Sequence, residues 1–128
     1  GDGNPNNPAE YEENSVVYTG THDNDTLCGF LEHADENTLA DVRRHYPGAA
    51  DLPGALIGSL MESRAYMAIV PMQDWLRLGG DARMNTPGTV GDFNWTWRMD
   101  ADANLAALAP QIRARLEKTG RLIKEETR

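Results

Sequence analysis

The fold of this chain is indicated first by residues 15–26, which have the sequence SVVYTGTHDNDT. Residues 15–19 are mostly β-branched or aromatic, which is typical of a short strand buried on both faces. Six of the next seven residues, 20–26, have polar side chains, and Asp25 or Asn24 is placed to cap a following helix. The segment therefore predicts a strand, a polar loop and a helix in that order.

Hydrophobic periodicity outside this segment predicts further helices and a second buried strand. We expect helices over residues 36–46 and 53–64, a strand over residues 65–70, one or two helical turns over residues 72–78, and a helical tail from residue 103 that Pro110 divides in two. A right-handed crossover would pair the two strands in parallel, as in an α/β fold. Because an isolated parallel pair leaves faces and edges uncovered, we expect the chain to be part of a larger fold.

Composition limits the classes of partner and of compartment. The chain has 128 residues, with 12 Lys and Arg against 20 Asp and Glu, so its formal net charge is −8. Such a charge disfavours nucleic acid and anionic membrane surfaces as partners. No apolar run reaches the roughly 18 residues of a membrane span, the N-terminus does not resemble a signal peptide, and a single cysteine, Cys28, fits a reducing compartment. We expect a soluble, cytoplasmic protein.

The densest group of chemically capable side chains is His22 and Asp23, at the carboxyl end of the first predicted strand. Binding and catalytic groups gather at that edge in parallel α/β folds. Asp23 would then act as an acid, a base or an electrostatic group with His22 beside it. Alternatively, this segment only caps the following helix, and His22 is a packing residue. For Asp25 and Thr26 we favour the capping role. The glycine-rich loop over residues 85–91 can also position ligand groups, because the Asn85 amide is both donor and acceptor.

Metal, nucleotide and covalent sites have weaker support. Asp2, Asn4, Asn6 and Glu13 have calcium-loop spacing, but Asn7 replaces the required glycine. The three histidines, His22, His33 and His45, lie too far apart for a zinc site, and no phosphate-binding or dinucleotide glycine motif occurs. We therefore expect no metal and no cofactor. Cys28 is predicted to be a small packing residue. The tryptophans Trp75, Trp95 and Trp97 could stack on sugar rings or fill a core.

Three segments resemble the 4-alpha-glucanotransferases, also called amylomaltases or disproportionating enzymes, of glycoside hydrolase family 77. They are residues 16–26 (VVYTGTHDNDT), residues 73–88 (QDWLRLGGDARMNTPG) and residues 94–98 (NWTWR). Their order and separation are similar to those in the C-terminal quarter of that family. The resemblance implies a (β/α)8 barrel that transfers α-1,4-glucan segments between maltooligosaccharides with retention of configuration. By this mapping residues 1–128 are one segment of the barrel, with a loop over 1–14 and strands seven and eight within 15–128.

The resemblance also implies roles for individual residues. A retaining mechanism needs a carboxylate nucleophile and a carboxyl acid/base, and in this family both belong to strands four and five, upstream of residue 1. Asp23 matches a third carboxylate, which stabilises the transition state, while His22 and Asn85 match substrate-binding positions. The chain alone is therefore expected to be inactive. Residues 9–14 depart from the family pattern. The alternatives are a non-catalytic α-glucan-binding module and a piece of an α-amylase-type hydrolase.

Overall fold

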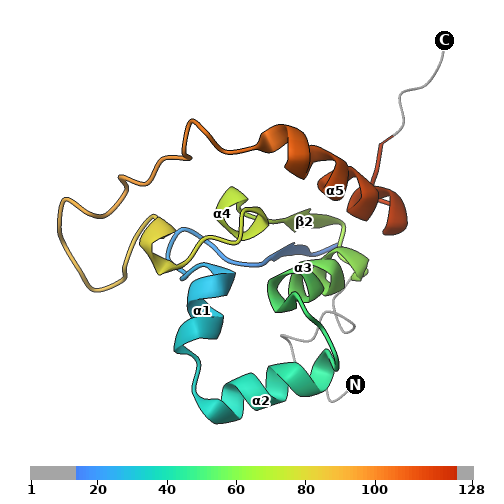
Figure 1. The fold of residues 1–128 in the computed structure, drawn as a ribbon, viewed down its shortest axis with the longest axis horizontal. Coiled ribbons are helices and arrows are strands. Elements are labelled where there is room, and N and C mark those ends of the chain that lie inside the picture. The colour runs from blue at the N-terminus through green and yellow to red at the C-terminus, as the bar shows by residue number, and fades with distance from the viewer. Residues whose placement is uncertain (1–13, 124–128) are drawn as a thin grey trace.

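The computed structural model describes residues 14–123, and its centre is a sheet of two parallel strands (Figure 1). Strand β1 comprises Val16–Tyr18 and β2 comprises Met67–Ile69, with Val17 paired to Ala68. Both predicted strands and their parallel pairing are therefore confirmed. The loop predicted over residues 1–14 and the calcium-loop positions lie outside the described residues, apart from Asn14.

Three helices connect the strands, and three further helical segments follow β2. They are α1 (Leu27–His33), α2 (Glu36–His45), α3 (Leu52–Glu62), α4 (Met72–Trp75), the 3-10 helix η2 (Gly80–Ala82) and α5 (Leu105–Lys118). Helices are thus the main regular structure of the described residues, and the order of strands and helices is the α/β order that the sequence predicted. None of the helices they contain is long and apolar enough to cross a membrane.

The N-terminus of α1 is determined by a hydrogen bond from its own first turn to a capping side chain. Thr26 caps α1, since its Oγ1 accepts a hydrogen bond of 3.0 Å from the Gly29 N–H. The capping role favoured for Thr26 is therefore confirmed. The prediction that Asp25 or Asn24 would be this cap was wrong, because the Asn24 side chain accepts from Thr21 and Asp25 Oδ1 accepts from the Thr26 N–H. Caps by side-chain oxygen satisfy amides that have no partner inside the helix.

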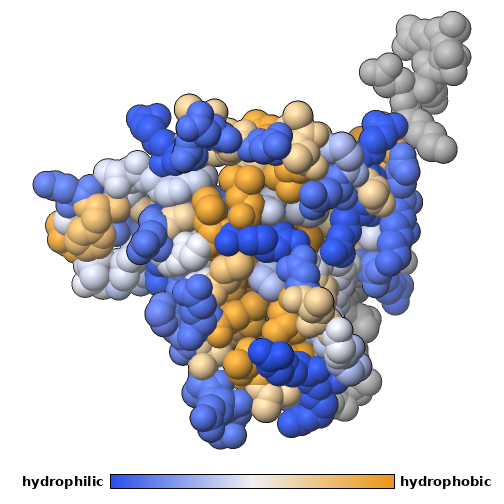
Figure 2. Space-filling view, viewed as in Figure 1, coloured by the Kyte–Doolittle hydropathy of each residue, from blue (hydrophilic) through white to orange (hydrophobic). Residues whose placement is uncertain are grey.

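One face of the sheet packs on α3 and the other is open. Val17 and Ala65 are buried with Leu60 of α3, and Ala68 and Val70 pack against them. The side chains on the other face are 41–49% exposed: Val16, Tyr18, Met67 and Ile69. The expectation of strands buried on both faces was therefore wrong, because in residues 14–123 the sheet has two strands and the residues on its second face stay partly exposed. Apolar side chains gather in the middle of the face shown in Figure 2, between more hydrophilic helices.

Helix α5 is continuous through Pro110, so the predicted division into two helices was wrong. Proline lacks an N–H and therefore removes one intrahelical bond, to the carbonyl of residue 106, while the remaining bonds continue. The segment after α5 is fixed by Arg121, whose guanidinium donates to the carbonyl oxygens of Met61, Ser63 and Ala65 at 2.6, 3.0 and 2.9 Å. This contact ties the C-terminal helix to the junction of α3 and β2.

Candidate functional site

The polar loop after β1 is fixed at both of its ends by Asp74, a carboxylate of α4 that is only 2% exposed. Its Oδ2 accepts a hydrogen bond of 2.6 Å from Thr19 Oγ1, and its Oδ1 accepts one of 2.8 Å from the Leu27 N–H. Thr19 follows β1 and Leu27 begins α1. A single buried carboxylate therefore sets the separation of the two ends of the loop over residues 20–26.

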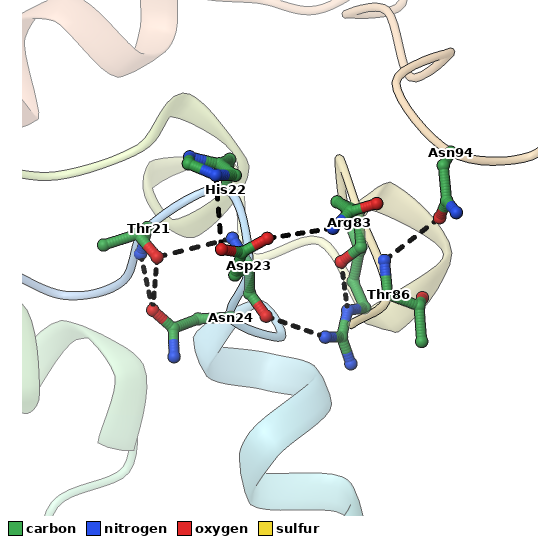
Figure 3. A network of polar contacts seen from close by, with 8 residues as sticks. Thr21, His22, Asp23, Asn24, Arg83, Thr86 and Asn94 are labelled. Atoms are coloured by element: carbon green, nitrogen blue, oxygen red, sulfur yellow. Dashed lines mark hydrogen bonds and ion pairs between the residues drawn. The ribbon is translucent and has the colours of Figure 1, made fainter. Parts of the chain in front are cut away.

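Inside this loop, short-range hydrogen bonds determine where the side chains point. Asn24 Oδ1 accepts from the Thr21 N–H at 2.7 Å and from Thr21 Oγ1 at 2.9 Å, and the Asp23 N–H donates to Thr21 Oγ1 at 3.3 Å (Figure 3). These bonds form a tight turn of the kind that Asn and Thr favour. Asn24 and Thr21 thus shape the loop, and the Asp23 carboxylate is left free to reach a second segment.

That second segment is the loop after η2, and it brings together the three predicted site residues. The Asn85 amide Nδ2 donates a hydrogen bond of 2.9 Å to Asp23 Oδ1. On the other carboxylate oxygen, His22 Nε2 lies 3.3 Å from Asp23 Oδ2. The side chains of His22 and Asp23 are 57% and 52% exposed. The result is a solvent-accessible carboxylate held between an amide and an imidazole.

Arg83 joins the two loops through their backbones. Its Nη2 donates to the carbonyl oxygen of Asp23 at 3.0 Å, and its Nε donates to the carbonyl oxygen of Asn85 at 3.2 Å (Figure 3). We did not predict this residue or Asp74 as part of the site. Both lie in segment 73–88, one of the three that resemble the family. That resemblance is the signal that could have pointed to them, because neither contact follows from local periodicity.

The second loop turns back on itself and places an indole ring beside the imidazole. The Thr86 N–H donates to Asn94 Oδ1 at 3.0 Å (Figure 3), and the Trp95 N–H donates to the Met84 carbonyl oxygen. The ring centroids of His22 and Trp95 are 5.1 Å apart, with an angle of 39° between the planes. Trp95 has a φ of 64°, which is unusual for a residue with a bulky side chain.

A cleft of about 520 Å³ lies next to these residues. His22 and Arg83 line it, whereas Asp23 and Asn85 contribute no lining atoms. The other lining residues are Tyr18, Gly20, Thr21, Asn24, Asp25, Thr26, Ile69, Pro71, Gln73, Asp74, Ala82 and Met84. More than half of these fourteen residues have polar or charged side chains, although most of the lining surface is apolar, and such a cleft suits a small organic ligand with polar groups.

The group combines a carboxylate, an amide and an imidazole. In residues 14–123 no group of three His, Cys, Asp or Glu side chains is placed to hold a metal ion. Cys28 is half-buried on α1, and desolvation raises the pKa of its thiol, so the protonated form dominates at neutral pH. Asp23, by contrast, can accept hydrogen bonds from ligand hydroxyls and stabilise positive charge through space.

Comparison with known proteins gives one consistent result. A family model described as 4-alpha-glucanotransferase matches residues 1–104. The 4-alpha-glucanotransferase of Solanum tuberosum, named as chloroplastic/amyloplastic, is 40% identical over 124 residues, which are 93% of this chain and 21% of that protein. The 4-alpha-glucanotransferase of Thermus thermophilus is 38% identical over 128 residues, which are 93% of this chain and 25% of that protein.

A solved structure gives the same result in three dimensions. The amylomaltase from Streptococcus agalactiae in complex with acarbose has a TM-score of 0.81 and 29% identity to this chain. The match covers 89% of this chain and 23% of that one. The chain therefore spans about a fifth to a quarter of the length of the relatives that it matches.

Proposed function

This chain belongs to the 4-alpha-glucanotransferase family, and we propose that it supplies one of three active-site carboxylates, Asp23, to an enzyme that transfers α-1,4-glucan segments between maltooligosaccharides. The observation that carries the proposal is the hydrogen bond of 2.9 Å from Asn85 to Asp23. This bond joins residues 16–26 to residues 73–88, and each of these segments resembles the family. Its acceptor, Asp23, is the residue to which the resemblance assigns a catalytic role.

We propose that β1 and β2 are the seventh and eighth strands of a (β/α)8 barrel. The parallel pairing, the packing of α3 on one face and the apolar side chains on the open face support this assignment. In such barrels the active site lies at the carboxyl ends of the strands. The loop that carries His22 and Asp23 follows the carboxyl end of β1, which agrees with this rule.

The proposed role of Asp23 follows from the chemistry of retention. Retaining transfer passes through transition states that resemble an oxocarbenium ion, with a nucleophile and an acid/base on two other carboxyl groups. The proposal assigns those two groups to the part of the relatives that this chain does not match. Asp23 would accept hydrogen bonds from sugar hydroxyls and favour the developing positive charge. Asn85 holds Oδ1 in place, and His22 would form a hydrogen bond with the same sugar.

The proposed partners are α-1,4-glucans and maltooligosaccharides. The Streptococcus agalactiae amylomaltase was solved with acarbose, which supports a sugar ligand of this class. A neutral glucan needs no basic surface, so the net charge of −8 is compatible with it. The cytoplasmic localisation stays a prediction, and the Solanum tuberosum relative is named as chloroplastic/amyloplastic.

The proposal is tested with a hybrid enzyme in which this chain replaces the matched segment of the Thermus thermophilus protein. We expect the hybrid to release glucose from maltotriose. In the hybrid, Asp23→Asn should lower kcat by about a hundredfold or more, because it removes charge needed in the transition state. It should weaken glucan binding by less than about tenfold, since an amide still accepts hydrogen bonds.

Two comparisons complete the test. Asp81→Asn removes an exposed carboxylate on η2 and should leave kcat within about twofold of the parent hybrid, because it lies on an exposed surface. Equal losses of kcat and of binding in Asp23→Asn would reduce Asp23 to a simple binding residue. The purified 128-residue chain without the rest of the hybrid should release no glucose.

A further inference from the structure

Trp95 is the most exposed of the three tryptophans, and it is the one that contacts the site. Its residue surface is 57% exposed, whereas Trp75 and Trp97 are half-buried. The centroid of its ring lies 5.1 Å from the centroid of the His22 ring. An exposed indole loses the hydrophobic stabilisation that burial would give. Its position is therefore not explained by packing into a core.

The backbone of Trp95 is also held in an unfavourable conformation. A φ of 64° lies in the left-handed region, where the β-carbon crowds the following carbonyl oxygen. Asn94 keeps the segment in this shape through hydrogen bonds to the Thr86 N–H at 3.0 Å and to Thr89 Oγ1 at 3.1 Å. Residues strained in this way cluster at ligand sites, where the surrounding structure maintains the strain.

From the exposure, the strain and the contact with His22, we infer that the indole of Trp95 is a stacking platform for one glucosyl ring of an α-glucan, next to the hydroxyl-binding group formed by Asp23 and Asn85. The ring of a glucose unit has apolar C–H faces and polar hydroxyls at its rim. The apolar face would lie on the indole while the hydroxyls reach the carboxylate and the amide. This inference rests on the proposed function and assigns one residue of its substrate site.

The test uses the 15N-labelled 128-residue chain, whose three tryptophans give three indole N–H resonances. Maltoheptaose is titrated in, with a β-1,4-linked glucan of similar length as the control ligand. We expect the Trp95 indole resonance, assigned by its loss in Trp95→Phe, to shift in a saturable manner with maltoheptaose. The resonances of Trp75 and Trp97 should stay in place, and the control ligand should shift none of them.

Variants separate stacking from a structural role. Trp95→Gly removes the ring, and glycine adopts a φ of 64° without strain. We expect it to weaken maltoheptaose binding by between about twofold and tenfold, while the midpoint of urea unfolding stays the same or rises. Trp97→Phe is the matched control and should leave the affinity unchanged. A fall in the unfolding midpoint of Trp95→Gly would show that the ring serves packing, and would overturn the inference.

A double-mutant comparison separates a direct contact from an effect through His22. If Trp95 only orients the imidazole, His22→Ala with Trp95→Gly will bind maltoheptaose as weakly as His22→Ala alone, and the inference fails. If the indole touches the sugar, the double variant will be weaker. Shifts at Asp23 and Asn85 without one at Trp95 would overturn the stacking platform alone. An absence of shifts at all three residues would contradict the glucan site of the proposed function.

Discussion

The amide of Asn85 donates a hydrogen bond of 2.9 Å to the carboxylate of Asp23 from 62 residues further along the chain. The two side chains come from the loop after β1 and the loop after η2, and Arg83 ties the same two residues together through their carbonyl oxygens. The orientation of the carboxylate is therefore a property of the assembled fold. Neither loop on its own would determine the orientation of the Asp23 carboxylate.

Removal of the Asn85 amide should weaken glucan binding by the chain. Asn85→Ala deletes a hydrogen bond to a charged group, and such bonds contribute about 1.5–3 kcal/mol. Because the site is exposed, we expect the lower end, or roughly a tenfold loss of affinity for maltoheptaose measured by NMR titration. Asn37→Ala, at an exposed position on α2, is the control and should bind normally. Equal affinities in the two variants would show that this amide does not organise the site.

Loss of the Thr19 hydroxyl should destabilise the fold by about 1–3 kcal/mol. Thr19→Val keeps the shape of the side chain but removes a donor to Asp74, whose carboxylate is buried. Urea unfolding measures the change in the free energy of unfolding. Thr119→Val is the matched control, since Thr119 Oγ1 donates to a backbone carbonyl at the end of α5, and it should cost about 1 kcal/mol or less. A control as costly as Thr19→Val would argue against a special role for the Asp74 contact.

Asp51 should contribute to stability at neutral pH and lose that contribution in acid. The side-chain hydrogen bond from Arg77, with a further bond from the Gly54 N–H, lowers the pKa of the Asp51 carboxyl below its usual value. A group with a lower pKa in the folded state stabilises the fold above its unfolded pKa of about 3.9. Stability from this source is therefore lost as the pH falls from about 4 through the folded pKa.

The measurement is urea unfolding at pH 7 and at pH 3 for the parent chain and for Asp51→Asn. The variant should be less stable at pH 7 by less than about 1 kcal/mol, since more than half of the Asp51 side chain is exposed. The difference should shrink at pH 3. Asp41→Asn is the control on the surface of α2, where Asp41 pairs with Arg44. A difference for Asp51→Asn that grows in acid would reverse the expected sign and contradict the assignment.

Gly29→Ala should destabilise the chain although alanine favours helices. A β-carbon at this position would lie 2.6 Å from Asp25 Cγ and closer still to Asp25 Oδ1, which accepts from the Thr26 N–H. Overpacking of this kind costs about 1–3 kcal/mol, against a helix-propensity gain of about 1 kcal/mol.

The control for this prediction is Gly58→Ala in α3. Its β-carbon would meet only the end of the flexible Arg115 side chain, so the unfolding midpoint should stay the same or rise. Equal midpoints of urea unfolding for the two alanine variants would show that the Asp25 side chain can move away from a β-carbon at residue 29 without cost.

Local pattern was enough to predict both strands and to mark His22 and Asp23 as candidate site residues, but it did not predict the contacts that these residues make. β-branched runs predicted β1 and β2, and polar residues after β1 indicated His22 and Asp23, because these signals lie within a few residues of one another. Asp74 and Arg83 act on residues that are far away in the chain, so periodicity carries no sign of them. Pro110 was overestimated as a helix breaker, because one lost hydrogen bond is tolerated when the rest of the helix continues.

The pairing of β1 with β2 has a consequence for the order of events in folding. About fifty residues, including α1, α2 and α3, lie between the paired positions Val16 and Met67. Contacts that close such a long segment form more slowly than the turns of a helix. The bonds from Thr19 to Asp74 and from Asn85 to Asp23 span similar lengths of chain. We therefore expect the helices to form early and the ligand-binding arrangement to be the last part acquired on folding and the first part lost on partial unfolding.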